Sequence, residues 1–113
     1  MDPLLEHYYG PLDTLLSRKD LIELSVIGEG NIGFEYAARG YDFENHPELN
    51  QSYWRRLCTA LANYNGLSFN PPEHSFLSLA LPGGHRFQAK MGKGVGSGLD
   101  ISIRLFRDID MPL

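Results

Sequence analysis

Hydrophobic and polar residues alternate with a period of two along residues 20–45. Ile22, Leu24 and Val26 fall on one side of an extended chain, with polar residues between them. The alternation resumes after a glycine-rich turn at 28–31 and again after Arg39-Gly40. Three short antiparallel strands in a meander are therefore expected, with Ile22, Leu24, Val26, Ile32, Phe34, Tyr36, Tyr41 and Phe43 as their apolar positions.

The clearest helical spacing lies in residues 50–65. Asn50 is placed to cap this helix, and Asn65-Gly66 ends it with residues that tolerate a left-handed conformation. Trp54 and Tyr53 are expected to anchor the helix to the sheet. Its apolar positions are Tyr53, Trp54, Leu57, Cys58, Leu61 and Tyr64.

The first residues predict two short helices. Asp2 and Pro3 can open the first, which ends at Gly10, and Pro11 can open a second. The apolar faces of the two are formed by Leu4, Leu5, Tyr8, Tyr9, Leu12, Leu15 and Leu16.

Three further strands are expected in the second half of the chain, over residues 76–81, 85–91 and 100–106, with a tight hairpin turn at Gly83-Gly84. Helices and strands are grouped rather than strictly alternating, which favours an α+β fold with an antiparallel sheet of about six strands and two or three helices. At 113 residues, the chain is expected to form one domain over residues 1–113.

Composition and charge narrow the classes of function. A hydrophobic share of 42% excludes a disordered chain, and a formal net charge of −4 argues against direct binding of nucleic acid. No apolar stretch approaches the length needed to span a bilayer. Cys58 is the single cysteine, which suits a reducing compartment, and a cytoplasmic protein is expected.

The glycine-rich segment Gly92–Gly98 is a candidate phosphate-binding loop by composition. Its only Gly-Lys pair, Gly92-Lys93, is followed by Gly94, so the hydroxyl residue of a Walker A motif is missing. The pattern that follows is a strand, and no helix N-terminus is available for a phosphate. A flexible hairpin loop is the favoured interpretation.

The strands that this loop joins place two arginines together. If Met91 pairs with Leu99 in an antiparallel register, Phe87 lies opposite Ile103 and Arg86 lies opposite Arg104. Like charges directly opposite are destabilising, so the pair either has an acidic or solvated environment or binds an anion such as phosphate. The strand pattern alone leaves both interpretations open.

The other candidate residues favour structural or solvated roles. The histidines His7, His46, His74 and His85 lack metal-ligand spacing, and Asp108 and Asp110 lie in a polar tail. Cys58 is expected to be a packed core cysteine, and Arg55 and Arg56 to lie on a solvated helix face.

In the second half of the chain, particular residues, and not only the pattern of apolar and polar positions, resemble those of a known family. Residues 57–64, the run SFLSLALPGGHRFQA at 75–89 and the run ISIR at 101–104 are similar to the N-terminal domain of the hexameric traffic ATPases of bacterial type IV secretion and conjugation systems. Residues 12–26 agree more loosely, and Leu79 stands where the family pattern has alanine.

The resemblance implies a PAS-like α+β domain that forms one tier of a six-membered ring on the cytoplasmic face of the inner membrane. It implies that ATP, with Mg²⁺, binds between this domain and a C-terminal RecA-like domain, and that Arg86 and Arg104 reach the phosphates. The expected partners are the protein's own ATPase domain, further copies of the chain and other secretion components, with only peripheral membrane association.

One departure from the family concerns catalysis. The chain ends at Leu113 before any Walker A motif, so these residues alone are expected to bind no cofactor and to be inactive, with Met111–Leu113 leading into the linker. A glycine-rich loop is unusual for the family, which leaves Lys93 without an assigned role. The alternative hypothesis is a stand-alone PAS-like sensor or adaptor that binds a small ligand or a protein in the cup of its sheet.

Overall fold

A six-stranded antiparallel sheet forms the centre of the part of the chain that the structure describes. The structure is a computed structural model, and it describes residues 3–70, 75–92 and 98–106. The strand order is β3-β2-β1-β6-β5-β4, so the two halves of the chain meet at the β1–β6 pair. The elements are α1 (Pro3–Leu16), β1 (Leu21–Gly28), β2 (Asn31–Tyr36), β3 (Gly40–Asn45), α2 (Gln51–Tyr64), β4 (Phe76–Ala80), β5 (Arg86–Met91) and β6 (Leu99–Arg104).

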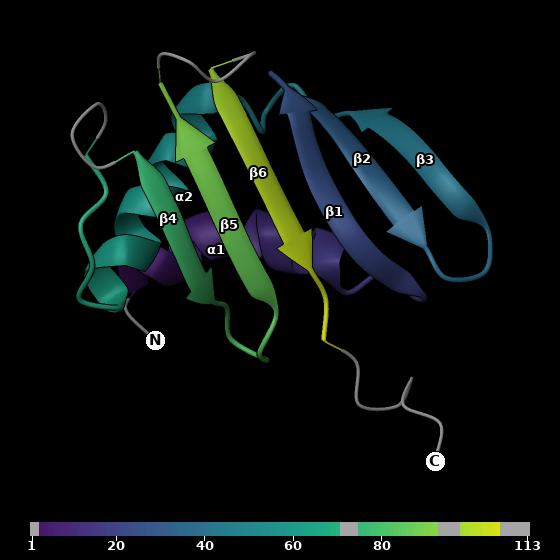
Figure 1. Cartoon of the computed structure of the whole chain (residues 1–113), viewed down its shortest axis with the longest axis horizontal. Coiled ribbons are helices and arrows are strands. Elements are labelled where there is room, and N and C mark those ends of the chain that lie inside the picture. Colours follow the sequence, from purple (N-terminus) through teal and green to yellow (C-terminus); the bar gives the residue numbers. More distant parts are fainter. Residues whose placement is uncertain (1–2, 71–74, 93–97, 107–113) are drawn as a thin grey trace.

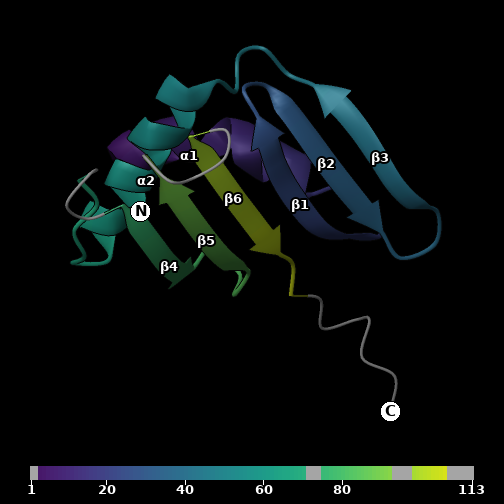
Figure 2. The same ribbon diagram turned by 45° about the horizontal axis from the view of Figure 1, so that its top comes forward.

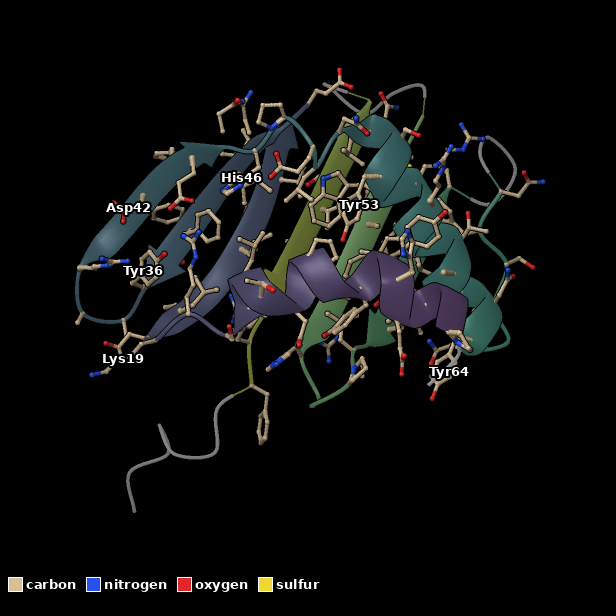
Figure 3. The ribbon with its side chains drawn as sticks, turned by 180° about the vertical axis from the view of Figure 1, so that it is seen from behind. Lys19, Tyr36, Asp42, His46, Tyr53 and Tyr64 are labelled. Carbon is tan, nitrogen blue, oxygen red and sulfur yellow. The ribbon has the colours of Figure 1, made fainter. Side chains whose placement is uncertain are left out.

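Both helices lie on the same face of this sheet and leave the other face open (Figures 1 and 2). Seen from behind, α1 crosses the strands and α2 packs beside it, while β3 lies beyond the helices (Figure 3). The α+β class with an antiparallel sheet is therefore confirmed. Neither described helix is long and apolar enough to cross a membrane.

The residues between the helices and the sheet form one apolar core. Trp54, Phe34 and Phe87 are fully buried there, and no described polar or charged residue is buried. The alternation along β2 is confirmed, because Ile32, Phe34 and Tyr36 are all buried.

The prediction of two short N-terminal helices is wrong. The structure has one continuous helix, α1, with Pro11 inside it. Proline removes one backbone N–H from a helix and disfavours the helical conformation of the residue before it. Here the residue before it is Gly10, which has no Cβ, and Leu5, Leu12 and Leu16 on both sides of the proline are buried together. Tertiary burial thus keeps the helix continuous.

The first strand departs from simple alternation. The pairing of β1 with β2 shifts register between Leu21 and Glu23, so Leu21 and Leu24 are both fully buried although they are three residues apart. Ile22, which the alternation placed on the buried side, is only half-buried. Such an irregularity inserts one extra residue, so the residues before it point to the opposite face of the sheet from the one that regular alternation predicts.

The helix α2 follows its prediction closely. The Asn50 side chain accepts a hydrogen bond from the backbone N–H of Tyr53 at 2.9 Å, and Gly66 has a φ of 68° beyond the C-terminal end. Trp54 is buried and its indole N–H donates to the carbonyl of Leu49. Tyr53 instead holds the two helices together, because its hydroxyl donates to the carbonyl of Tyr8.

The second half of the sheet also has the predicted register. Gly83 and Gly84 both have positive φ angles, of 91° and 89°, in the turn between β4 and β5. Met91 pairs with Leu99, and Phe87 pairs with Ile103. The strand ends differ from the predicted ends by one or two residues.

Candidate anion-binding site

The open face of the sheet carries a row of four charged side chains, one from each of four neighbouring strands. Directly opposite residues of paired strands lie on the same face, so successive pairings define the row. Arg86 pairs with Arg104, Arg104 pairs with Glu23, and Glu23 pairs with Glu35. The row is Arg86 on β5, Arg104 on β6, Glu23 on β1 and Glu35 on β2.

The two arginines of this row have different surroundings. Arg104 Nη2 lies 3.4 Å from Glu23 Oε1, and the Arg104 side chain is 78% exposed against 23% for Glu23. Arg86 is exposed and makes no ion pair with any described residue. Its neighbour on the other side in the sheet is Ala80, which carries no charge. Arg104 is thus partly neutralised and Arg86 is not.

Shallow hollows flank the arginine pair on both sides. One, of about 310 Å³, lies beside Arg86 and is lined by Ser78, Leu79, Ala80 and Gly84 as well. The other, of about 260 Å³, lies beside Arg104 and is lined by Ile22, Glu23, Glu35 and Leu105 as well. The first therefore contains a guanidinium without a carboxylate, and the second contains both charges.

This arrangement suits a small polyvalent anion. Cβ atoms of directly opposite residues are about 4.5–5.5 Å apart, so both guanidinium groups can reach the oxygens of one phosphate chain. Guanidinium forks match phosphate in a bidentate geometry. A shared anion would also relieve the repulsion between Arg86 and Arg104. The predicted register of the arginines is confirmed, whereas their binding of phosphate stays a prediction.

The histidines do not form a metal site within the described residues, where no group of three potential ligands is found. His7 packs edge-on against Tyr8, and His85 Nδ1 accepts a hydrogen bond from the Phe106 backbone N–H. His46 contacts two glutamates, Glu44 and Glu48. His74, Asp108 and Asp110 lie outside the described residues.

The glycine-rich segment joins two strands, as predicted. The backbone N–H of Gly92 donates to the carbonyl of Gly98, which closes the loop between β5 and β6. Lys93 and the residues to 97 lie outside the described residues. The element that follows is β6 rather than a helix, so the argument against a phosphate-binding loop is sustained.

Cys58 and the helix arginines lie where the sequence predicted. Cys58 is buried, and burial raises the pKa of its thiol to about 12, which keeps it protonated and unreactive. Arg55 and Arg56 are exposed on α2 and line a groove of about 400 Å³ together with Tyr8 of α1. Neither forms an ion pair with a described residue.

A second charged cluster, which the sequence pattern did not predict, lies on the helix side of the sheet. Arg18 donates two hydrogen bonds to Glu44, at 2.6 and 2.9 Å, and its guanidinium lies 4.2 Å from the ring centre of Phe34. Glu44 also contacts His46 Nε2 at 2.8 Å. The cluster fastens β3 to the segment that follows α1. Only the alternation of β3, which turns Glu44 toward the helix side and leaves Phe43 69% exposed, could have indicated it.

This cluster predicts a loss of stability in acid. The hydrogen bond from Arg18 is the main cause that lowers the pKa of Glu44 from 4.5 to about 2. A carboxylate whose pKa is lower in the folded state than in the unfolded state stabilises the fold at pH values above the unfolded-state pKa. This contribution is lost as the pH falls from about 4.5 toward 2. Because the pair is partly solvated, the loss is expected to be at most about 1 kcal/mol.

Urea unfolding followed between pH 6 and pH 2 tests this expectation about the Glu44 carboxylate. Glu44→Gln is expected to lower the free energy of unfolding at pH 6 and to flatten its decline below pH 4.5. Glu29→Gln, in an exposed turn, is the control and should keep the slope of the parent chain. Equal slopes for Glu44→Gln and the parent would show that the ion pair with Arg18 contributes nothing.

Comparison with known proteins relates this fold to solved structures, one of which is a secretion ATPase. No family model matches the chain, and no curated protein matches its sequence. The VirB11 ATPase from the Brucella suis type IV secretion system, solved in complex with sulphate, has the same fold with a TM-score of 0.85 over 97% of this chain. The identity is 22%, and the match spans 32% of that protein. The resemblance to this class is thus confirmed at the level of the fold.

Proposed function

We propose that this chain is the N-terminal domain of a type IV secretion ATPase, which couples ATP hydrolysis to substrate translocation or pilus assembly. The observation that carries the proposal is the arginine pair Arg86 and Arg104, placed side by side on the open face of a sheet with the fold of a VirB11 ATPase. The motif resemblance at residues 75–89 and 101–104 supports it independently, because it rests on the sequence alone.

In this proposal the domain binds and positions, and the chemistry belongs to a second domain. The two exposed guanidinium groups fit the phosphates of ATP, and the remaining site would be supplied by a RecA-like domain carrying Walker motifs and Mg²⁺. The domain would also contribute to a hexameric ring and dock on other secretion components at the cytoplasmic face of the inner membrane. The chain spans about a third of the length of the solved protein, and the proposal assigns these activities to the whole ATPase.

The direct test substitutes the arginines in the full-length ATPase. Arg86→Ala and Arg104→Ala are each expected to lower ATP turnover about ten- to a hundred-fold, because each removes a charge-assisted hydrogen bond to phosphate. Arg55→Ala, which removes another exposed arginine, from the helix side, is the control and should retain turnover. Circular dichroism of each variant should be unchanged, since Arg86 and Arg104 are exposed. Normal turnover in both arginine variants would remove their phosphate role.

A separate observation tests the architecture. The proposal expects the reading frame to continue into a Walker A motif, whereas a stand-alone sensor or adaptor expects a stop codon near Leu113. The sensor hypothesis also expects a sizeable enclosed pocket in the cup of the sheet. On the face that the helices cover, the space against the sheet holds fully buried side chains, among them Trp54, Phe34 and Phe87, so the packing there does not favour such a pocket.

A further inference from the structure

The ion pair between Glu23 and Arg104 lies inside the proposed phosphate site and has no assigned role. It is long and monodentate, with one nitrogen 3.4 Å from one oxygen, near the limit at which a hydrogen bond is counted. The Arg104 side chain is mostly in solvent and can leave the contact without unpacking the core. The pair is therefore exchangeable, unlike the bidentate pair of Arg18 and Glu44 on the other face.

We infer that Glu23 acts as an electrostatic gate on Arg104, holding this guanidinium until a phosphate group displaces the carboxylate. The inference rests on the proposed function, and it makes Glu23 a positioning residue that acts through Arg104. Arg86, with no carboxylate directly opposite it, is the first contact for the anion. Arg104 then exchanges its Glu23 contact for an oxygen of the same anion.

The neighbours of Glu23 determine how strongly the gate is held. Glu35 lies directly opposite Glu23 on β2, so two like charges face each other across the strands. Directly opposed like charges are destabilising, and Arg104 on the other side of Glu23 offsets this repulsion. Releasing Arg104 leaves the two carboxylates facing each other without a counter-charge. Only a ligand that returns more than one favourable contact, such as a polyphosphate, can offset that cost.

The row therefore favours a polyvalent anion over a monovalent one. A single-charge anion gains one guanidinium, Arg86, while Glu23 retains the other. A polyphosphate reaches Arg86 and still has oxygens for Arg104, which lies directly opposite on the next strand. The gate thus sets a threshold for anion charge at this site.

Binding of inorganic triphosphate to the chain, measured by calorimetry at an ionic strength of about 0.15 M, tests the gate. Glu23→Gln is expected to lower the Kd of triphosphate by about 1.5- to 5-fold, the range that corresponds to losing one exposed ion pair. Asp100→Asn is the matched control, because it removes one carboxylate from the same face four residues along β6 from Arg104, about 13 Å away, where its charge is screened. Its Kd should equal that of the parent chain.

A double-mutant cycle separates a gate from a general effect of charge. If Glu23 acts through Arg104, adding Glu23→Gln to the Arg104→Ala chain should leave its Kd unchanged. If Glu23 only repels the anion by its charge, Glu23→Gln should lower the Kd equally in the parent chain and in the Arg104→Ala chain. A Glu23→Gln chain with the Kd of the parent, or an equal gain in the Arg104→Ala background, overturns the gate.

The outcome for Arg86 distinguishes failure of the gate from failure of the proposed function. Loss of triphosphate binding in Arg86→Ala, with no effect of Glu23→Gln, rejects the gate and retains the arginine site. No binding by the parent chain, or full binding by Arg86→Ala, rejects the phosphate role of the pair and the gate with it. A parent chain that prefers triphosphate to chloride, with a smaller preference in Glu23→Gln because Arg104 is then free for either anion, supports the threshold for polyvalent anions.

Discussion

Replacing Trp54 with alanine is expected to lower the free energy of unfolding by about 3–5 kcal/mol, the range for truncating a buried aromatic residue. Trp54 is fully buried between α2 and the sheet, and its indole N–H donates a 3.0 Å hydrogen bond to the carbonyl of Leu49. Native domains have total stabilities of about 5–15 kcal/mol. If the parent chain lies at the lower end of that range, Trp54→Ala leaves it about 0–2 kcal/mol, between its unfolding midpoint and a marginally folded state. Urea unfolding followed by circular dichroism measures the change.

Two control variants at α2 separate the sources of this loss. Trp54→Phe retains most of the apolar volume and removes the hydrogen bond to Leu49, so it should cost clearly less than Trp54→Ala. Tyr64→Ala truncates an aromatic residue of the same helix that is 54% exposed, and it should cost under about 1 kcal/mol. A Trp54→Ala chain that loses no more than Tyr64→Ala would contradict the assignment of Trp54 to the centre of the core.

The half of the sheet that contains the arginines could be predicted in detail because local rules determine it. Gly83-Gly84 sets a tight turn, and alternation along β5 and β6 permits only registers of one parity. The pairing of Arg86 with Arg104 follows from that parity. Their phosphate role rests on the family resemblance and stays a prediction.

The partner of Arg104 could not be predicted, because it depends on a contact between distant parts of the chain. Glu23 lies 81 residues before Arg104 in sequence, and the two meet only because β1 and β6 form the centre of the sheet. No local pattern specifies that β1 pairs with β6 rather than with another strand. The irregularity at Leu21 and Ile22 also requires the three-dimensional structure, because it places Leu21 in the apolar core against the simple alternation of the strand.

The N-terminal half also shows where local signals are overridden. Gly10-Pro11 is a strong local signal for a helix end, yet α1 continues through it because its leucines are buried on both sides. In β3, Tyr41 and Phe43 stack on each other on the open face and are 51% and 69% exposed. Apolar alternation identified these residues as strand positions but did not indicate which face they occupy.

The turn between β1 and β2 provides the second prediction of a large effect. Gly30 has a φ of 76°, and a Cβ at this position would lie 3.1 Å from the carbonyl oxygen of His46 and 3.3 Å from Cα of Pro47. Both contacts are to backbone, which cannot move aside as a side chain can. The His46 N–H also donates to the Gly30 carbonyl at 2.6 Å, so the turn holds the end of β3 against the sheet. Gly30→Ala is expected to cost about 2–5 kcal/mol, from backbone strain and overpacking together.

Gly40→Ala is the matched control for this loss, because it carries the same backbone strain without the contact. Gly40 has a φ of 78°, and a Cβ there would meet nothing within 4 Å. Its substitution should therefore cost only the strain of a left-handed residue, about 1–2 kcal/mol. The difference between the two variants in urea unfolding isolates the close approach of His46 and Pro47 to the turn. If the two losses are equal, the turn does not fasten β3, and the position of the Arg18 and Glu44 cluster must then depend on the ion pair itself.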